Sequence, residues 1–349
     1  MGAAQIVQGA GNKMRNSIGI LVSFALIPIL TSCRPTSSRT VVVYVSEDQV
    51  FSEPILKDFE RETGITVKSV FDTEESKSTG VMNRLIAEKD NPQADVYWAN
   101  EPVRADALKQ RGVSTPYVSP SAEGIPDQFK DSDHYWTGFS ARARLLLVNA
   151  RSTIKPVSVT AYTDPSANRR AAIANPLFGT TTDYVAALFT IWGNERARTF
   201  MNDMKKNGVK ITTSNGESTD LVAAGQVDFS LVDSDDAVNT KKQGKPVEMI
   251  YPDQEPDGIG VLILPNAVAL IKGGPHAENG KRLIDYLLSK DTEHKLAFAD
   301  CAQIPLHSRV ETPPEVRRIE DIKPMRVGYA DLARKMEAIQ PFLKEWAGQ

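Results

Sequence analysis

The sequence has few of the residues that form covalent links or hold metals in enzymes. Its 349 residues include two cysteines and four histidines. It has no H-E-x-x-H zinc motif, no serine-centred nucleophile elbow, no Walker loop and no glycine-rich dinucleotide turn. The net charge of −3 also argues against a general nucleic-acid binder. These absences favour a protein without catalytic chemistry and leave a secreted enzyme as a distant alternative.

The N-terminus has the pattern of an export signal. Two basic residues precede an apolar run over residues 18–30, which suits a signal peptide and is short for a membrane span. Leu30-Thr31-Ser32-Cys33 then resembles the lipobox of bacterial lipoproteins, in which the cysteine receives lipid. We predict a signal peptide with lipobox over residues 1–33 and a polar tether over residues 34–39. An ordinary signal peptide with a chance cysteine is the alternative.

The two cysteines are not expected to form a disulfide. If Cys33 carries lipid, Cys301 has no partner, and we expect it to be a buried thiol. Stability must then come from core packing, for which a chain of this length is sufficient. No second apolar run is long enough to span a bilayer. The sequence therefore predicts an exported body that contacts the membrane through a lipid on Cys33.

Apolar strand patterns alternate with amphipathic helix patterns from residue 40 onward. The predicted strands are 41–45, 65–71, 94–99, 144–149, 171–174, 209–212, 227–232, 247–251, 260–264 and 268–271, the last two broken at Pro265. The predicted helices are 54–62, 80–89, 102–110, 183–192, 195–206, 218–224, 235–242, 276–288, 292–300 and 329–346. Ser218 or Thr219 is expected to cap the helix that begins there. This alternation predicts an α/β fold with a largely parallel sheet covered by helices.

The stretch from Asn175 to Tyr184 joins a predicted strand to a predicted helix. Pro176 and Gly179 break the strand, and the hydroxyls of Thr180–Thr182 are expected to cap the helix. A helix start carries unpaired N–H groups and a positive dipole end. The stretch is therefore suited to an anion, with a plain N-cap as the alternative.

Polar side chains follow several predicted strands at their carboxyl ends, where ligands sit in open α/β sheets. They include Ser46 and Glu47 after the first strand and Asn100 after the third. Any one of them could be a solvated turn, so their joint position carries the argument. Adjacent acids such as Asp235 and Asp236 are expected to face apart on a helix.

Several stretches resemble one bacterial protein family. They are Phe59-Glu60-Arg61-Glu62-Thr63-Gly64-Ile65, Ala94-Asp95-Val96-Tyr97-Trp98, Leu145-Leu146-Leu147-Val148-Asn149 and Gln303-Ile304-Pro305-Leu306. The family is the extracellular solute-binding proteins (group 1, ferric-iron-binding-like) of ABC importers. The resemblance implies a type II periplasmic-binding-protein fold, with two lobes, a ligand cleft and crossover hinge strands near Asn149 and Pro265. It places residues 40–140 and 265–349 in one lobe and residues 141–264 in the other.

The resemblance also implies a role and a first ligand. The role is that of a monomeric lipoprotein that hands solute to an ABC permease in the cytoplasmic membrane, without a resident cofactor. Iron-binding members hold Fe³⁺ with two neighbouring tyrosines, and this chain offers one, Tyr184. The possible iron ligands are Glu47, Glu74, Tyr184 and Asp233, with Asp235 as an alternative. The histidines His276, His294 and His307 are expected on exposed polar faces.

A small oxyanion, such as a phosphate ester or a phosphonate, is the rival ligand. Hydroxyls, helix N-termini and the guanidinium of Arg142 or Arg144 favour it. The acids from Asp233 to Asp236 fit it when they bind hydroxyls or an amine on the same ligand. The predicted ligand-binding residues are Ser46, Glu47, Thr73, Glu74, Asn100, Arg142, Thr180, Thr181, Thr182, Tyr184, Asp233 and Asp235.

Overall fold

The computed structural model describes residues 39–72 and 80–348. The predicted signal peptide, the lipid site Cys33, nearly all of the tether, and the predicted site residues Thr73 and Glu74 lie outside the described residues. Within the described part, no helix has the length and apolar character needed to cross a bilayer.

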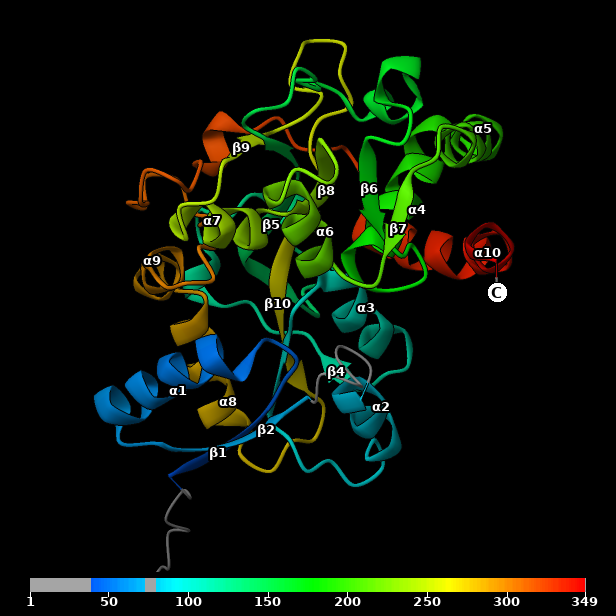
Figure 1. Cartoon of the computed structure of the whole chain (residues 1–349). Helices are drawn as coiled ribbons and strands as arrows, with labels where there is room; N and C mark the ends of the chain where they lie inside the picture. Colours follow the sequence, from blue (N-terminus) through cyan, green and yellow to red (C-terminus); the bar gives the residue numbers. More distant parts are fainter. Residues whose placement is uncertain (1–38, 73–79, 349) are drawn as a thin grey trace, which may run out of the picture. The chain divides into compact units, whose positions relative to one another are not determined.

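The strands and helices follow the predicted order (Figure 1). The strands are β1 Thr40–Val45, β2 Thr66–Phe71, β3 Val96–Ala99, β4 Ser114–Thr115, β5 Thr137–Asn149, β6 Ala171–Ala174, β7 Lys210–Thr212, β8 Phe229–Asp233, β9 Val247–Ile250 and β10 Ile263–Ile271. The helices are α1 Gln49–Thr63, α2 Gly80–Ala87, α3 Pro102–Gln110, α4 Gly179–Trp192, α5 Asn194–Lys206, α6 Asn215–Ala223, α7 Ser234–Lys242, α8 Ala277–Leu287, α9 Lys290–Phe298 and α10 Tyr329–Ala347.

The strands form a mixed sheet in the order β2-β1-β3-β10-β5-β8-β6-β7, with β4 beside β10 and β9 beside β5. β1 is parallel to β2 and β3, and β6 is parallel to β7 and β8. β10 is antiparallel to β3 and β5, and β5 is antiparallel to β8 and β9. The prediction of a largely parallel sheet was therefore wrong, because the two longest strands run against their neighbours. Both are buried along most of their length, so their apolar runs carry no signal of direction.

The two crossing strands are longer than predicted. β5 begins at Thr137 instead of residue 144, and β10 is one strand that continues through Pro265. Pro265 faces Ala141 and Asn266 faces Phe139, so Ser140 is an extra residue without a partner in the ladder. Ser140 also has a positive φ of 39°. The predicted break at Pro265 is thus a β-bulge, a place where a strand tolerates proline.

Side chains satisfy the backbone of the bulge. The Ser140 N–H donates to Glu293 Oε1 at 2.8 Å, and Asn266 Nδ2 donates to the Ser140 carbonyl at 2.7 Å. Glu293 is fully buried and also accepts from the backbone N–H groups of Leu306 and His307, at 2.8 and 2.9 Å. This carboxylate therefore ties α9, the start of β5 and the loop after α9 together.

One histidine prediction was wrong. His307 is buried, and its Nδ1 lies 2.8 Å from Glu293 Oε2. It follows α9 in a loop, where a helix-face argument does not apply. His276 lies just before α8, and its Nδ1 is 3.2 Å from the buried Asp95. The side chain of His294 is 44% exposed, as expected for a helix face.

Three helices start three or more residues earlier than predicted. α1 begins at Gln49, α4 at Gly179 and α6 at Asn215. The residue that precedes α4 is Phe178, which makes no side-chain cap, so Thr180–Thr182 are not caps. Ser214 caps α6 by accepting from the Glu217 N–H at 3.1 Å, in place of Ser218 or Thr219.

The C-terminal helices pack on distant parts of the chain. The Phe59 ring of α1 lies 5.4 Å from the Tyr286 ring of α8. The last helix, α10, packs on α4 and α5. The Phe342 ring lies 5.5 Å from the Phe189 ring, and Trp346 Nε1 donates to the Met201 carbonyl at 2.9 Å. The division into lobes at residues 40–140 plus 265–349 and 141–264 stays a prediction.

Replacing Glu293 with alanine should destabilise the fold strongly, because it leaves several buried donors without an acceptor. We expect a loss of about 3–5 kcal/mol in the free energy of unfolding, measured by urea denaturation. Glu278→Ala is the control, since this side chain is 84% exposed in an ion pair with Lys281 and should contribute less than about 1 kcal/mol. Equal stability of the two variants would contradict the role of Glu293 at the bulge.

Candidate functional site

Arg144 on β5 is a buried charge beside the carboxyl end of β8. Its side chain is fully buried. Its hydrogen-bond partners are Asp233 Oδ1 at 2.9 Å, Thr180 Oγ1 at 3.0 Å, Thr181 Oγ1 at 3.1 Å, and Asn215 Oδ1 and the Leu231 carbonyl at 3.2 Å. A buried charge requires such partners, so Arg144 fixes the start of α4 against the end of β8.

The threonine hydroxyls at the start of α4 are engaged by the protein. Thr180 and Thr181 accept from Arg144, and the Thr180 hydroxyl donates to Asp233 Oδ2 at 2.8 Å. The Thr182 hydroxyl donates to the Pro176 carbonyl at 2.9 Å. These three predicted ligand residues therefore hold the site together in this structure instead of presenting an open anion pocket.

Arg142 lies two residues before Arg144 on β5, which places both side chains on the same face of the strand. Its Nη2 donates to the Asn100 carbonyl at 2.5 Å. Burial, the largest influence, lowers the pKa of Arg142, but nearby carboxylates outweigh it and raise the pKa overall. In order of influence, these carboxylates are Asp233, Glu47, Asp235 and Glu101. Residues that follow β1, β3 and β8 thus meet at Arg142, as the strand-end argument predicted.

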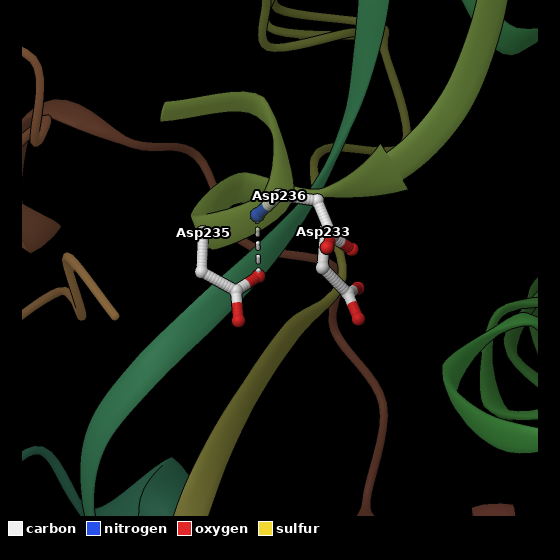
Figure 2. Close-up of side chains that lie close together, drawn as sticks. All are labelled: Asp233, Asp235 and Asp236. Carbon is white, nitrogen blue, oxygen red and sulfur yellow. Dashed lines mark hydrogen bonds between the residues drawn. The ribbon is translucent and has the colours of Figure 1, made fainter. Parts of the chain in front are cut away.

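The junction of β8 and α7 carries three acids: Asp233 ends β8, and Asp235 and Asp236 lie in the first turn of α7 (Figure 2). One carboxylate oxygen from each residue lies within 4.8 Å of the other two. The Asp236 N–H also donates to Asp235 Oδ1 at 3.0 Å, the dashed line in Figure 2. The expectation that Asp235 and Asp236 face apart was wrong, because a carboxylate oxygen of each lies within 4.8 Å of the other although the two residues are adjacent on α7. We call these three residues the acidic turn.

Burial changes the protonation of the acidic turn. Burial, followed by the charge of Asp233, raises the pKa of Asp235 to about 6, although Arg142 opposes the change. Burial and the charges of Asp235 and Asp233 raise the pKa of Asp236 well above its usual range. Below about pH 6 a proton therefore occupies Asp235, and a bound cation would have to displace it.

The predicted residues after β1, Ser46 and Glu47, are buried and bonded to neighbours within the protein. Ser46 is buried, and its hydroxyl is 2.9 Å from Asp72 Oδ2 and 3.0 Å from the Tyr97 hydroxyl. Glu47 is also buried, and its Oε1 accepts from Gln303 Nε2 at 3.1 Å. Both side chains are held by neighbours within the protein.

Tyr184 is placed differently from the other predicted iron ligands. It is buried in the apolar core, and its hydroxyl has no hydrogen-bond partner among the described residues. Burial, followed by the charge of Asp253, raises its pKa well above the usual range. A tyrosinate at this position is therefore strongly disfavoured in this conformation.

The predicted ligand set omitted two buried acids that face each other, Glu101 and Asp183. Glu101 Oε1 accepts from Arg104 Nε at 3.0 Å, whereas Glu101 Oε2 and both Asp183 carboxylate oxygens have no hydrogen-bond donor among the described residues. Burial and Glu101 raise the pKa of Asp183 well above its usual range. Glu101 could have been found from the sequence, because it follows Asn100 directly after β3. Asp183 gave no such signal, because it sits in an apolar helix run.

Comparison with known proteins identifies the family. The family model described as bacterial extracellular solute-binding protein matches residues 55–323. The chain belongs to this family. The protein is therefore a solute-binding protein of an ABC importer, acts on the outer side of the cytoplasmic membrane, and is not an enzyme.

Individual relatives differ in the ligand that their names give. Iron uptake protein A1 of Synechocystis is 24% identical over 337 residues, covering 87% of this chain and 91% of the relative. A putative 2-aminoethylphosphonate-binding periplasmic protein of Salmonella typhimurium is 24% identical over 295 residues, covering 82% of this chain and 80% of the relative. The solved ferric binding protein of Campylobacter jejuni matches with a TM-score of 0.78 at 19% identity, covering 88% and 99% of the two chains. The mixed α/β periplasmic-binding-protein fold is thereby confirmed.

Replacing Arg144 with methionine should destabilise the protein rather than only weaken binding. The change leaves Asp233 buried without its cation, which costs about 3–5 kcal/mol. Urea denaturation measures this loss. The double variant Arg144→Met/Asp233→Leu should recover part of the stability, because it removes the unpaired charge. A single variant as stable as the wild type would contradict the structural role of Arg144.

Proposed function

We propose that this protein captures ferric iron at the acidic turn and delivers it to a membrane permease. The observation that carries the proposal is the approach of three carboxylates to within 4.8 Å of one another. Carboxylate oxygens are hard anionic ligands, and a hard cation such as Fe³⁺ prefers them. The name of the Synechocystis relative supports the same cargo.

The surrounding charges favour iron that arrives with an anion. Arg144 already neutralises Asp233 at 2.9 Å, and Arg142 lies among the same carboxylates. A bare Fe³⁺ ion would meet two guanidinium groups beside its ligands, whereas a chelate such as ferric citrate brings negative charge that Arg142 can pair with. We therefore expect the acidic turn to bind the metal and Arg142 to face its accompanying anion.

The rest of the proposed function follows the predicted organisation of the chain. Capture requires the segments on either side of β5 and β10 to close on the solute, and closure excludes water, which strengthens each charged contact. The lobes would be residues 40–140 with 265–349 and residues 141–264. A lipid on Cys33 would hold a monomer at the membrane beside its permease.

A small oxyanion is the second candidate cargo. The Nε atoms of Arg142 and Arg144 are buried without a hydrogen-bond partner among the described residues, so the site has donors to offer. The name of the Salmonella relative points the same way, to an amine-bearing phosphonate. In that case the acidic turn would pair with the amine.

Titration with ferric citrate and with 2-aminoethylphosphonate separates the two candidates. We expect one ferric ion per protein, with affinity reduced at least about tenfold in Asp235→Asn and Asp236→Asn, because each loses a hard ligand. Tyr184→Phe should bind normally, and the wild type should show no visible tyrosinate band. Asp257→Asn, an exposed acid, is the control. Saturation by the phosphonate and not by iron would replace the iron proposal with the second candidate.

Iron affinity should fall as the pH falls through about 6. The raised pKa of Asp235, caused first by burial and then by Asp233, means that a proton occupies it below this pH and competes with the metal. Citrate also titrates, so the test compares wild type with Asp235→Asn at each pH from 5 to 8. The difference between the two proteins should shrink at low pH. A constant difference would show that Asp235 does not exchange its proton for iron.

A further inference from the structure

The segment Gln303–Leu306 contributed to the family resemblance without an assigned role. It lies directly beside the site. Ile304 and Ala141 exchange two backbone hydrogen bonds of 2.7 Å, so the segment pairs with β5 one residue before Arg142. The buried carboxylate of Glu293 accepts from the Leu306 N–H at the other end of the segment. The Gln303 side chain is therefore rigidly placed next to the bulge.

A row of four buried side chains connects the crossing strands to Glu47. Trp98 Nε1 donates to Asn266 Oδ1 at 3.1 Å, Asn266 Nδ2 donates to Gln303 Oε1 at 2.9 Å, and Gln303 Nε2 donates to Glu47 Oε1 at 3.1 Å. Trp98 and Gln303 are fully buried, Asn266 is 1% exposed and Glu47 is 6% exposed. We call this row the amide relay.

The direction of the amide relay is determined by chemistry. An indole N–H can only donate, so the oxygen of Asn266 must face Trp98. The Asn266 amide nitrogen then donates both to the Ser140 carbonyl, at 2.7 Å, and to the oxygen of Gln303. This turns the Gln303 amide nitrogen toward Glu47. Glu47 Oε1 is thereby fixed as an acceptor, in the orientation that places its charge near Arg142.

We propose that Gln303 and Asn266 are positioning residues that hold Glu47 near Arg142 for solute binding. Because Asn266 also holds the carbonyl of the bulged residue Ser140, the relay links the site to the crossing strands themselves. A change in the geometry of β5 and β10 is transmitted to Glu47 through two amides. The expected effect on solute affinity rests on the proposed function, whereas the expected effect on the position of Glu47 does not.

The test uses Gln303→Met, which keeps the length of the side chain and removes both relay bonds. Crystal structures without solute should show the Glu47 carboxylate displaced from Arg142, with β5 and β10 unchanged. Affinity for ferric citrate, or for 2-aminoethylphosphonate if iron does not bind, should fall about tenfold or more, as expected when a buried partner loses its hydrogen bond. Gln254→Met is the matched control: its amide bonds only backbone groups of Pro252 and Lys323.

Three comparisons distinguish positioning from a merely structural role. Trp98→Phe keeps an aromatic ring and removes only the hydrogen-bond donor, so it should displace Glu47 in the same direction as Gln303→Met. It replaces Gln303→Met as the test variant if that protein does not fold. In the single variant Gln303→Glu, two hydrogen-bond acceptors face each other. The exchange variant Glu47→Gln/Gln303→Glu should bind more tightly than this single variant, because the amide of residue 47 then donates to the carboxylate of residue 303. A Glu47 that stays in its wild-type position in Gln303→Met, or an affinity loss matched by Gln254→Met, would overturn the proposal. If the wild type binds neither probe, the crystal structures still decide the relay, and only the proposed function fails.

Discussion

The buried guanidinium of Arg144 is the constraint on which the site depends. A charge with no exposure is tolerated only when most of its donors are paired, and here the partners come from three separate parts of the chain: Asp233 ends β8, Thr180 and Thr181 start α4, and Asn215 starts α6. Three elements that are distant in sequence therefore converge on one residue of β5. The next inward-facing residue toward the bulge, Arg142, is consequently carried into the group of acids that the proposed function uses.

The bulge at Ser140 has the same importance for the other half of the fold. An extra residue in a buried ladder leaves a backbone N–H and a carbonyl without partners, and each would be costly if left unpaired. Glu293 and Asn266 supply the missing partners from α9 and β10. Stability and site geometry thus share one set of buried polar groups, because Asn266 also belongs to the row of side chains that ends at Glu47.

Predictions from the sequence succeeded where the signal was local. Residues 102–110 and 171–174 were predicted with their observed bounds, since Pro102 and the short apolar run mark them clearly. The polar residues after β1, β3 and β8 were also correctly expected near each other. The direction of β5 and β10 could not be predicted, because a strand buried on both faces has no alternation to read. The partners of Thr180 and of Asp183 were equally hidden, since they depend on contacts 35 residues or more apart in sequence, or on burial that composition does not reveal.

The protonation of the acids connects the empty and loaded forms of the site. Several carboxylates lie together out of water, and Arg144 and Arg104 are paired directly with Asp233 and Glu101. Burial raises the pKa values of Asp235, Asp236 and Asp183, and the charges of neighbouring carboxylates raise them further. Under the proposed function, a cation at the acidic turn competes with a proton on Asp235 below about pH 6, which lowers the net affinity of the site there. For the proposed carrier, uptake of a proton by Asp235 would favour release of the cargo to the permease, because the proton and the metal compete for the same carboxylate.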